Sequence, residues 1–205
     1  MPEALAGVAL VVASFLVGAV PWGYLLGQRS RGIDLRQVGS GGTGATNVLR
    51  TLGRGAAITV LVLDVLKGVL PIVIGRFAGF SAEWIAAAGV AAVAGHCWSP
   101  FIGFKGGKGM ATGAGAALAL FPPAVIAVPI FVGVVWRTRF VSLGSLIATT
   151  VASLLALLVA AMGQLPWSTA IAILAIAGII IGRHRQNIDR LRQGTERRFG
   201  ERIAT

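Results

Sequence analysis

Long stretches without a charged residue constrain the fold more than any other feature of this sequence. They extend over residues 4–28, 84–104, 109–136 and 140–182. A mostly apolar run of more than about 18 residues is long enough to cross a lipid bilayer. Charged residues make up 12% of the chain, whereas roughly 25% is typical of soluble domains. The sequence therefore predicts an all-α integral membrane protein.

Turn signals divide these stretches into about seven transmembrane segments. We expect helices at about 4–27, 55–75, 84–97, 110–121, 123–136, 140–161 and 166–182. A Pro pair in mid-helix removes hydrogen bonds and clashes with the preceding turn, so a helix should stop at Pro122-Pro123. The turn around Gly163 and Pro166 divides the longest stretch. We treat residues 1–205 as a single domain.

Positive charge determines the expected orientation. The formal charge of +11 comes from 18 Lys and Arg against 7 Asp and Glu, mostly in short loops and the C-terminal tail. Membrane orientation, anionic lipid or an anionic substrate explains this excess better than nucleic acid does. If the chain folds back at Pro122-Pro123, all the basic loops and the tail lie on one side, as the positive-inside rule requires. We therefore expect two short helices there, the N-terminus outside and a cytoplasmic C-terminus.

Two loops on the expected cytoplasmic side suit phosphate binding. Residues 39–50 combine glycines, whose N–H groups can form an anion nest, with Ser40, Thr46, Asn47 and Arg50. A flexible connector is the alternative interpretation of this loop. Lys105–Gly109 reads Lys-Gly-Gly-Lys-Gly at the expected start of a helix, where free N–H groups and two ammonium groups converge. It lacks the spacing of a Walker A loop, so the motif of a kinase or ATPase is missing.

A third polar segment follows the last expected span. His184 and Asn187 are one helical turn apart, so both can face the other loops, and Glu196 can fold back as an acceptor for a cation. His184 and Asp189 have the H-x4-D spacing of glycerolipid acyltransferases. On a continuous helix the two lie roughly 140° apart, so we interpret the match as coincidence. Within the second span, Asp64 and Lys67 are expected to neutralise each other.

Together the three loops resemble the bacterial acyl-phosphate:glycerol-3-phosphate acyltransferases, the PlsY family. The matching motifs are Ser40-Gly41 with Gly44–Asn47, Phe104–Gly109, and His184–Leu191 with Gly194 and Glu196. Gly42 stands where the family usually has Asn. The resemblance implies transfer of a fatty acyl group from acyl phosphate to the 1-hydroxyl of glycerol 3-phosphate, the first step of phospholipid synthesis. The products are lysophosphatidic acid and phosphate.

This resemblance leads us to assign roles to residues. We expect catalytic roles for Ser40, His96, Lys105, His184 and Asn187. We expect substrate binding by Thr46, Asn47, Arg50, Gly106, Gly107, Lys108, Gly109 and Glu196. The Gly106–Gly109 amides and Lys108 would bind acyl phosphate, and the other polar groups would position glycerol 3-phosphate. Either His96, His184 or the substrate phosphate would take the hydroxyl proton.

Acyl phosphate is already activated, so the reaction requires positioning and electrostatic stabilisation rather than a protein nucleophile. We expect no metal, no cofactor and no obligate protein partner, with membrane lipid around the helices. The expected location is the bacterial cell membrane. The alternative is a transporter of a phosphorylated metabolite. Transporters place their sites near the bilayer midplane, often between repeated halves, whereas these motifs gather at one interface and no repeat is visible.

Overall fold

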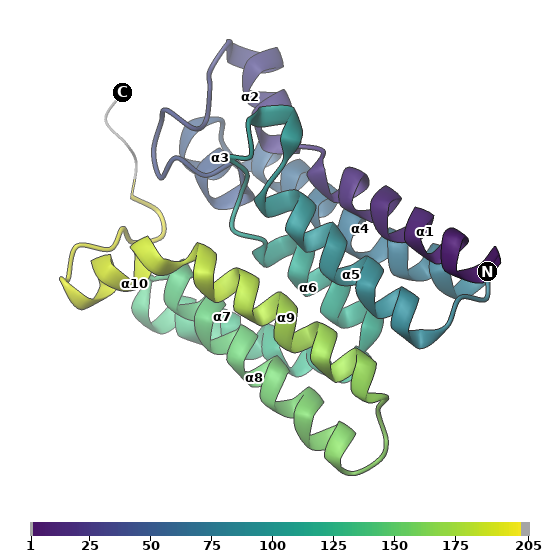
Figure 1. The fold of residues 1–205 in the computed structure, drawn as a ribbon. Coiled ribbons are helices and arrows are strands. Elements are labelled where there is room, and N and C mark those ends of the chain that lie inside the picture. Colours follow the sequence, from purple (N-terminus) through teal and green to yellow (C-terminus); the bar gives the residue numbers. More distant parts are fainter. Residues whose placement is uncertain (1, 202–205) are drawn as a thin grey trace.

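The computed structural model describes residues 2–201, and within them the chain forms helices and loops without a strand. The α-helices are α1 (Pro2–Ala19), α2 (Trp22–Arg31), α3 (Ala45–Thr51), α4 (Arg54–Phe77), α5 (Ala82–Cys97), α6 (Met110–Leu120), α7 (Ala127–Thr138), α8 (Val141–Ala161), α9 (Trp167–Arg183) and α10 (Arg185–Arg192). Two 3₁₀ helices are η1 (Pro100–Ile102) and η2 (Pro122–Ile126). The first turn of α1 and helix α10 lie at opposite ends of the bundle (Figure 1). The prediction of an all-helical fold is confirmed.

Length and hydropathy identify the helices that can cross a membrane. Within residues 2–201, four stretches are long and apolar enough: Glu3–Arg31, Arg54–Phe77, Ala82–Ile102 and Val141–Ala161. Helices α9 and α10 add a fifth if this pair, bent by 56°, counts as one span. The apolar helices Met110–Leu120 and Pro122–Thr138 are shorter. Each of the seven expected segments is therefore helical, but only four or five reach the length of a full span.

The first expected segment, 4–27, is not one continuous helix. Helix α1 ends at Ala19 and α2 begins at Trp22, because Pro21 between them has no N–H to donate. Side chains donate to carbonyl oxygens at the break: Lys67 Nζ donates to that of Val20 at 2.9 Å, and Ser99 Oγ donates to that of Ala19 at 2.6 Å. These bonds attach the break to α4 and to the loop after α5.

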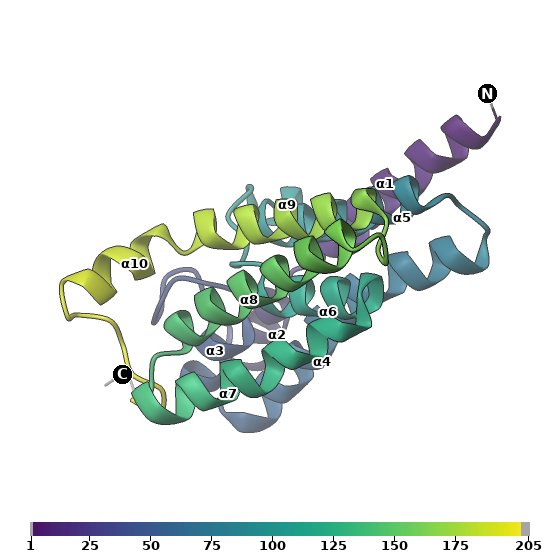
Figure 2. The ribbon, with the colours of Figure 1, turned by 90° about the horizontal axis from the view of Figure 1, so that it is seen from below.

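The 109–136 stretch folds back at its proline pair, as the sequence predicted. After η2, helix α7 returns to the end of the bundle from which α6 started (Figure 2). Lys108 precedes α6 and donates to Asn187, while Ser142 follows α7 and donates to Glu196, a partner of the same Asn187. Both ends of this hairpin therefore lie beside α10.

Small residues bring α1 and α5 into backbone contact. A β-carbon added at Gly18 would overlap the carbonyl group of Ala92, and one added at Gly95 would overlap that of Phe15. In lipid, helices associate through such close packing, because the surrounding tails are as apolar as the side chains. These two contacts fix the spacing of the two helices and the position of the loop that follows α5.

Replacing Gly18 by Ala should therefore lower the unfolding temperature in detergent. Forcing a methyl group into this contact costs about 1–3 kcal/mol. Gly133 in α7 provides the matched control, since an added β-carbon there meets no atom within 4 Å. Labelling of Cys97, the one cysteine of the chain and fully buried, reports unfolding. Equal unfolding temperatures for Gly18→Ala and Gly133→Ala would contradict the tight contact.

Candidate active site

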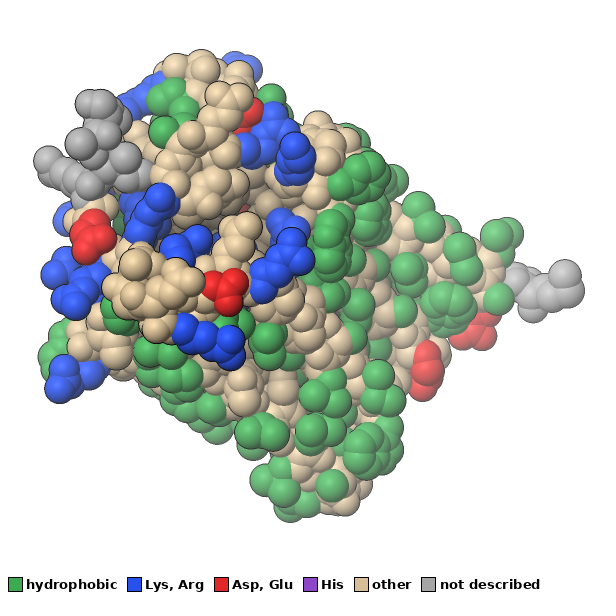
Figure 3. Space-filling model, turned by 60° about the vertical axis from the view of Figure 1, so that its left-hand side comes forward, with side chains coloured by type: hydrophobic (Ala, Val, Ile, Leu, Met, Phe, Trp, Pro, Cys, Tyr) green, Lys and Arg blue, Asp and Glu red, His purple; other side chains and the backbone are tan. Residues whose placement is uncertain are grey.

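A cavity of about 460 Å³ connects the three loops with the interior of the bundle. Polar and charged residues line its loop end: Ser40, Thr46, Asn47, Arg50, Lys108, His184, Asn187, Arg190, Glu196 and Arg197. Further in, its walls are apolar, with Leu118, Ala152 and Ile173 from α6, α8 and α9. Figure 3 shows Lys and Arg side chains gathered at the loop end of the molecule beside a mostly hydrophobic flank. The cavity thus combines a charged mouth with an apolar interior.

The shape of the first loop depends on Asn47. Its Oδ1 accepts a hydrogen bond from the N–H of Ser40 at 2.9 Å, and its amide group donates to three loop carbonyl oxygens at 2.9–3.0 Å. Its polar atoms are all engaged within the loop, so the structure supports a scaffolding role and leaves none free for the predicted substrate contact. Gly42, where the related family usually has Asn, has room for a side chain, because an added β-carbon would lie 3.7 Å from Ser40 Oγ.

Arg50 is the cation of the first loop region, as predicted, and it faces the cavity from α3 with Ser40 and Thr46. Its guanidinium group donates to the carbonyl oxygen of Arg198 at 3.5 Å. The pKa of Arg50 lies below its ordinary value, first because the group is buried and second because Arg197 carries a like charge nearby. An anion in the mouth of the cavity would relieve both effects.

The second loop is clamped between the ends of α5 and α9. The N–H of Gly106 donates to Cys97 at 3.2 Å, and that of Gly107 donates to His96 at 3.1 Å. Arg183 donates through Nε and Nη2 to the carbonyl oxygens of Gly107 and Gly106, each at 3.1 Å. A β-carbon at Gly107 would overlap the His96 ring. These glycines allow close packing, and because both N–H groups already donate to backbone carbonyl oxygens, the structure gives no support to the prediction that they bind phosphate.

Lys108 is the lysine of this loop that lines the cavity. Its Nζ donates to Asn187 Oδ1 at 2.5 Å, and burial lowers its pKa to about 8. Gly109 follows with φ of 80° and precedes the first turn of α6, whose N–H groups have no intrahelical acceptor. Lys105, in contrast, is exposed and does not line the cavity. The structure therefore gives no support to the predicted catalytic role of Lys105.

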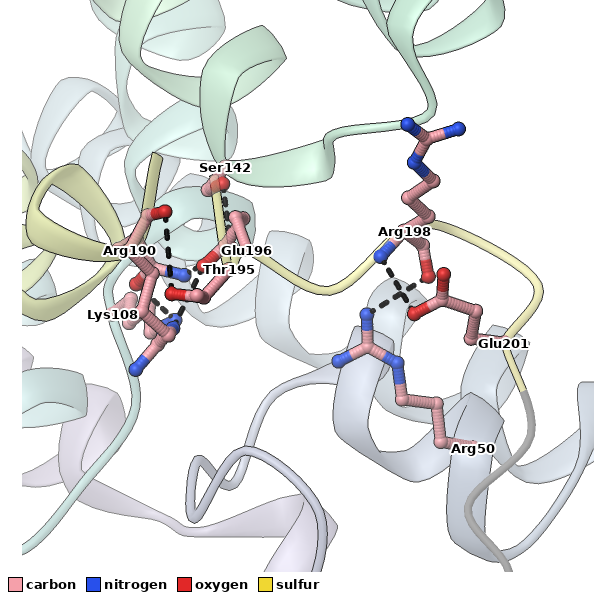
Figure 4. Close-up of polar contacts among 9 residues, drawn as sticks. Arg50, Lys108, Ser142, Arg190, Thr195, Glu196, Arg198 and Glu201 are labelled. Carbon is pink, nitrogen blue, oxygen red and sulfur yellow. Dashed lines mark hydrogen bonds and ion pairs between the residues drawn. The ribbon is translucent and has the colours of Figure 1, made fainter. Parts of the chain in front are cut away.

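Glu196 folds back onto α8 and α10, and the prediction that it accepts from a cation is confirmed. Arg190 Nε donates to its Oε2 at 2.8 Å, while Ser142 and Asn187 donate to Oε1 at 2.7 and 2.6 Å (Figure 4). Burial alone would raise the pKa of Glu196, but these donors hold it below its ordinary value. The ionised carboxylate thereby orients the Asn187 amide so that its oxygen faces Lys108.

Both predicted histidines line the cavity, in different surroundings. His184 lies between α9 and α10, and its Nδ1 is 2.7 Å from the carbonyl oxygen of Ile180. Because a carbonyl only accepts, Nδ1 must carry the hydrogen, which leaves Nε2 of the neutral ring as an acceptor. Burial lowers the pKa of His184 to about 4, so the ring is neutral at pH 7. His96 Nδ1 instead lies 3.6 Å from Asp64 Oδ1.

Two further expectations concern charged pairs. Lys67 Nζ lies 2.9 Å from Asp64 Oδ1 with both side chains buried, so the predicted neutralising pair is confirmed. Asp189 is exposed and has no hydrogen bond to His184 in the part of the chain that the structure describes. This geometry supports the interpretation of the H-x4-D spacing as a coincidence.

Three further residues of the site are not predicted from the residue pattern: Arg183, Ser142 and Arg197. Arg183 clamps the second loop and lies 5.8 Å from the ring centre of Trp98. The position of Arg183 directly before His184 could have indicated a role in the site. A basic residue at the end of a span is, however, equally typical of membrane orientation. No sequence pattern identifies Ser142 or Arg197 as site residues, because their contacts depend on the path of the C-terminal segment.

Comparison with known proteins shows to which family the chain is similar. Residues 8–194 match a family model described as glycerol-3-phosphate acyltransferase. A glycerol-3-phosphate acyltransferase of Geobacter sulfurreducens is 48% identical over 191 residues, which cover 93% of this chain and 96% of that protein. Glycerol-3-phosphate acyltransferase 1 of Deinococcus radiodurans is 45% identical over 203 residues, or 98% and 99% of the two chains.

Solved structures match as well. The crystal structure of PlsY (YgiH), an integral membrane glycerol 3-phosphate acyltransferase, in its glycerol 3-phosphate form gives a TM-score of 0.88 at 38% identity. Its lysophosphatidic acid form gives a TM-score of 0.85 at 36% identity. Each match covers 95% of this chain and 96% of the other. The similarity therefore extends over the helices and all three loops.

Proposed function

This chain belongs to the glycerol-3-phosphate acyltransferase family, and we propose that its acyl donor is acyl phosphate. It is a membrane acyltransferase of phospholipid synthesis that acylates glycerol 3-phosphate. One observation carries the proposal for the donor. The mouth of the cavity holds two separate groups for phosphate, Arg50 with the first loop and Lys108 with the start of α6, and it continues into an apolar interior. Two phosphate-bearing substrates, one of them with an acyl chain, suit this arrangement.

In the proposed reaction, each substrate uses one of these groups. Arg50 and Ser40 hold glycerol 3-phosphate, while Lys108 and the first N–H groups of α6 hold the phosphate of the donor. The oxygen of the 1-hydroxyl attacks the acyl carbon, the bond from that carbon to the phosphate oxygen breaks, and phosphate leaves. Because phosphate is a good leaving group, correct positioning and stabilisation of the developing oxyanion suffice.

The hydroxyl proton requires an acceptor, and of the two histidines His184 fits this role better. Its Nδ1 is committed to the carbonyl oxygen of Ile180, so Nε2 carries the free lone pair. The ring is neutral at pH 7 because burial lowers its pKa to about 4. His96 lies beneath the second loop, where its ring abuts Gly107, and this contact supports a packing role.

We also propose that the site faces the cytoplasm of a bacterium, with seven membrane segments, the N-terminus outside and the C-terminus inside. Three features at one end of the bundle support this orientation: the first loop, the Lys105–Gly109 loop and helix α10 with the arginines that follow it. Short cytoplasmic loops carry an excess of Lys and Arg, and residues 28–54, 105–109 and 183–198 together carry 13 of the 18 basic residues of the chain.

Acyl transfer from single donors tests the function. The purified protein in detergent receives labelled glycerol 3-phosphate with acyl phosphate, acyl-CoA or acyl-carrier protein, each supplied alone. We expect lysophosphatidic acid from acyl phosphate and none from the other two. Product from acyl-CoA alone would overturn the proposed donor. Net uptake of glycerol 3-phosphate into sealed vesicles, with no acylated product, would instead favour a transporter.

A further inference from the structure

The segment after α10, residues 194–201, borders the mouth of the cavity, which Glu196 and Arg197 line, and we call it the C-terminal strap. It is anchored at two points. One is Glu196, bound to α8 and α10 as described above (Figure 4). The other is Phe199, whose N–H donates to the carbonyl oxygen of Arg139 at 2.6 Å. The carbonyl oxygen of Phe199 accepts from Nε and Nη2 of Arg139 at 3.3 and 2.9 Å. The strap thus has a defined path between these anchors.

Arg197 lies between the two anchors and lines the cavity. Arg50 approaches the strap from α3, since its guanidinium group reaches the carbonyl oxygen of Arg198 at 3.5 Å. Arg197 and Arg50 are close enough for the positive charge of one to lower the pKa of the other, after the larger effect of burial. Two guanidinium groups of like charge therefore face the same end of the cavity.

The acidic residues nearby do not neutralise this pair. Glu196 already accepts from Arg190, Ser142 and Asn187. Glu201 accepts from the backbone N–H of Arg198 at 3.0 Å. Both carboxylates raise the pKa of Arg50 in part, yet its pKa stays below its ordinary value. The mouth of the cavity therefore retains an excess of positive charge that a bound anion would balance.

We propose that Arg197 is a further substrate-binding residue, which holds the phosphate of glycerol 3-phosphate together with Arg50. This inference rests on the proposed function. A phosphate monoester carries about −1.5 to −2 charges near pH 7, and guanidinium groups match its oxygens through paired hydrogen bonds. Glycerol 3-phosphate arrives from water at the mouth, whereas the acyl chain of the donor occupies the apolar interior. The strap lies almost entirely beyond residues 8–194, the region that the family model matches.

Arg197→Gln tests this assignment. We expect the KM for glycerol 3-phosphate to rise at least tenfold, while kcat and the KM for acyl phosphate stay within about twofold. Arg192→Gln is the matched control, because this exposed residue at the end of α10 lies outside the cavity lining and its loss changes the net charge equally. Arg197→Lys should give an intermediate KM for glycerol 3-phosphate, since it retains the positive charge but loses the paired hydrogen bonds that a guanidinium group makes.

Two results would overturn the proposal. One is a KM for glycerol 3-phosphate in Arg197→Gln within twofold of the control, and the other is a rise confined to the KM for acyl phosphate. Calorimetric titration of glycerol 3-phosphate, without any donor, separates this proposal from the proposed function. Wild-type protein that binds glycerol 3-phosphate but accepts no acyl phosphate would contradict the donor, while weaker binding by Arg197→Gln would still support the assignment of Arg197.

Discussion

Replacing Lys108 by Gln is expected to lower kcat/KM for acyl transfer by about 10³-fold, which corresponds to about 4 kcal/mol. The ammonium group is held 2.5 Å from Asn187 Oδ1, directly before the first turn of α6. There it faces the phosphate of the donor in the proposed reaction and stabilises the charge that develops as phosphate leaves. Steady-state kinetics with acyl phosphate and glycerol 3-phosphate measure the loss.

The same lysine predicts a dependence on pH. Burial lowers the pKa of Lys108 to about 8, so its charged form is present below that pH and is lost above it. Wild-type kcat/KM should therefore fall as the pH rises through about 8, and Lys108→Gln should lack this decline. Lys105→Gln is the control, because Lys105 is exposed and outside the cavity. An equal loss of activity in Lys108→Gln and Lys105→Gln would contradict the proposal that only Lys108 acts in the site.

The second large effect concerns stability. Lys67→Met should destabilise the protein by about 3–5 kcal/mol, because it leaves the buried Asp64 carboxylate without its partner at 2.9 Å. It also removes the donor to the Val20 carbonyl at the break between α1 and α2. Thermal unfolding in detergent, followed by labelling of Cys97, measures the change.

A double variant distinguishes loss of the pair from loss of packing. Lys67→Met with Asp64→Leu removes both charges, and replacing a whole buried pair by apolar residues is often neutral. We expect it to recover part of the unfolding temperature, with a remaining deficit because the hydrogen bond from Lys67 to the Val20 carbonyl oxygen stays lost. A double variant less stable than Lys67→Met would show that the charge left on Asp64 is not the cause.

The fold could be predicted where the covalent structure of a residue decides whether a helix continues. Proline has no N–H and restricts its neighbours, so the turn at Pro122-Pro123 followed from the sequence. The span expected over 4–27 is present as Glu3–Arg31, but it is broken between α1 and α2 for the same reason. Pro21 lies inside a run that is apolar on both sides, and the side chains that stabilise the break, Lys67 and Ser99, come from distant parts of the chain.

The site was harder to predict because one residue pattern serves two purposes. A glycine-rich loop with lysines is typical both of an anion nest and of a backbone that must pass close to another. Only the path of the loop along His96 and Cys97 shows that Gly106 and Gly107 have the second purpose. Lys105 and Lys108 differ in burial for the same reason, since the loop turns at Phe104 with a positive φ of 61°.

The C-terminal arginines show a second reason why site residues are hard to predict from sequence. A basic segment after the last span usually serves to orient the protein in the membrane. Residue type alone does not show that Arg197 lines the cavity and Arg192 does not. The distinction comes from the contact between Phe199 and Arg139, which are 60 residues apart in the sequence. Such a contact between two irregular segments has no periodic signature in the chain.

The hairpin of α6 and α7 has a consequence for the biogenesis of the protein. Its two ends lie on the same side, and the residues at its turn, Phe121 to Pro123, carry no charge. In the proposed topology, the four cations that flank the hairpin, Lys105, Lys108, Arg137 and Arg139, stay on the side where they are synthesised. A Lys or Arg at the centre of an inserting helix costs about 2.5–3.5 kcal/mol. The insertion machinery can therefore release both helices into the lipid as one unit, without translocating a charged residue.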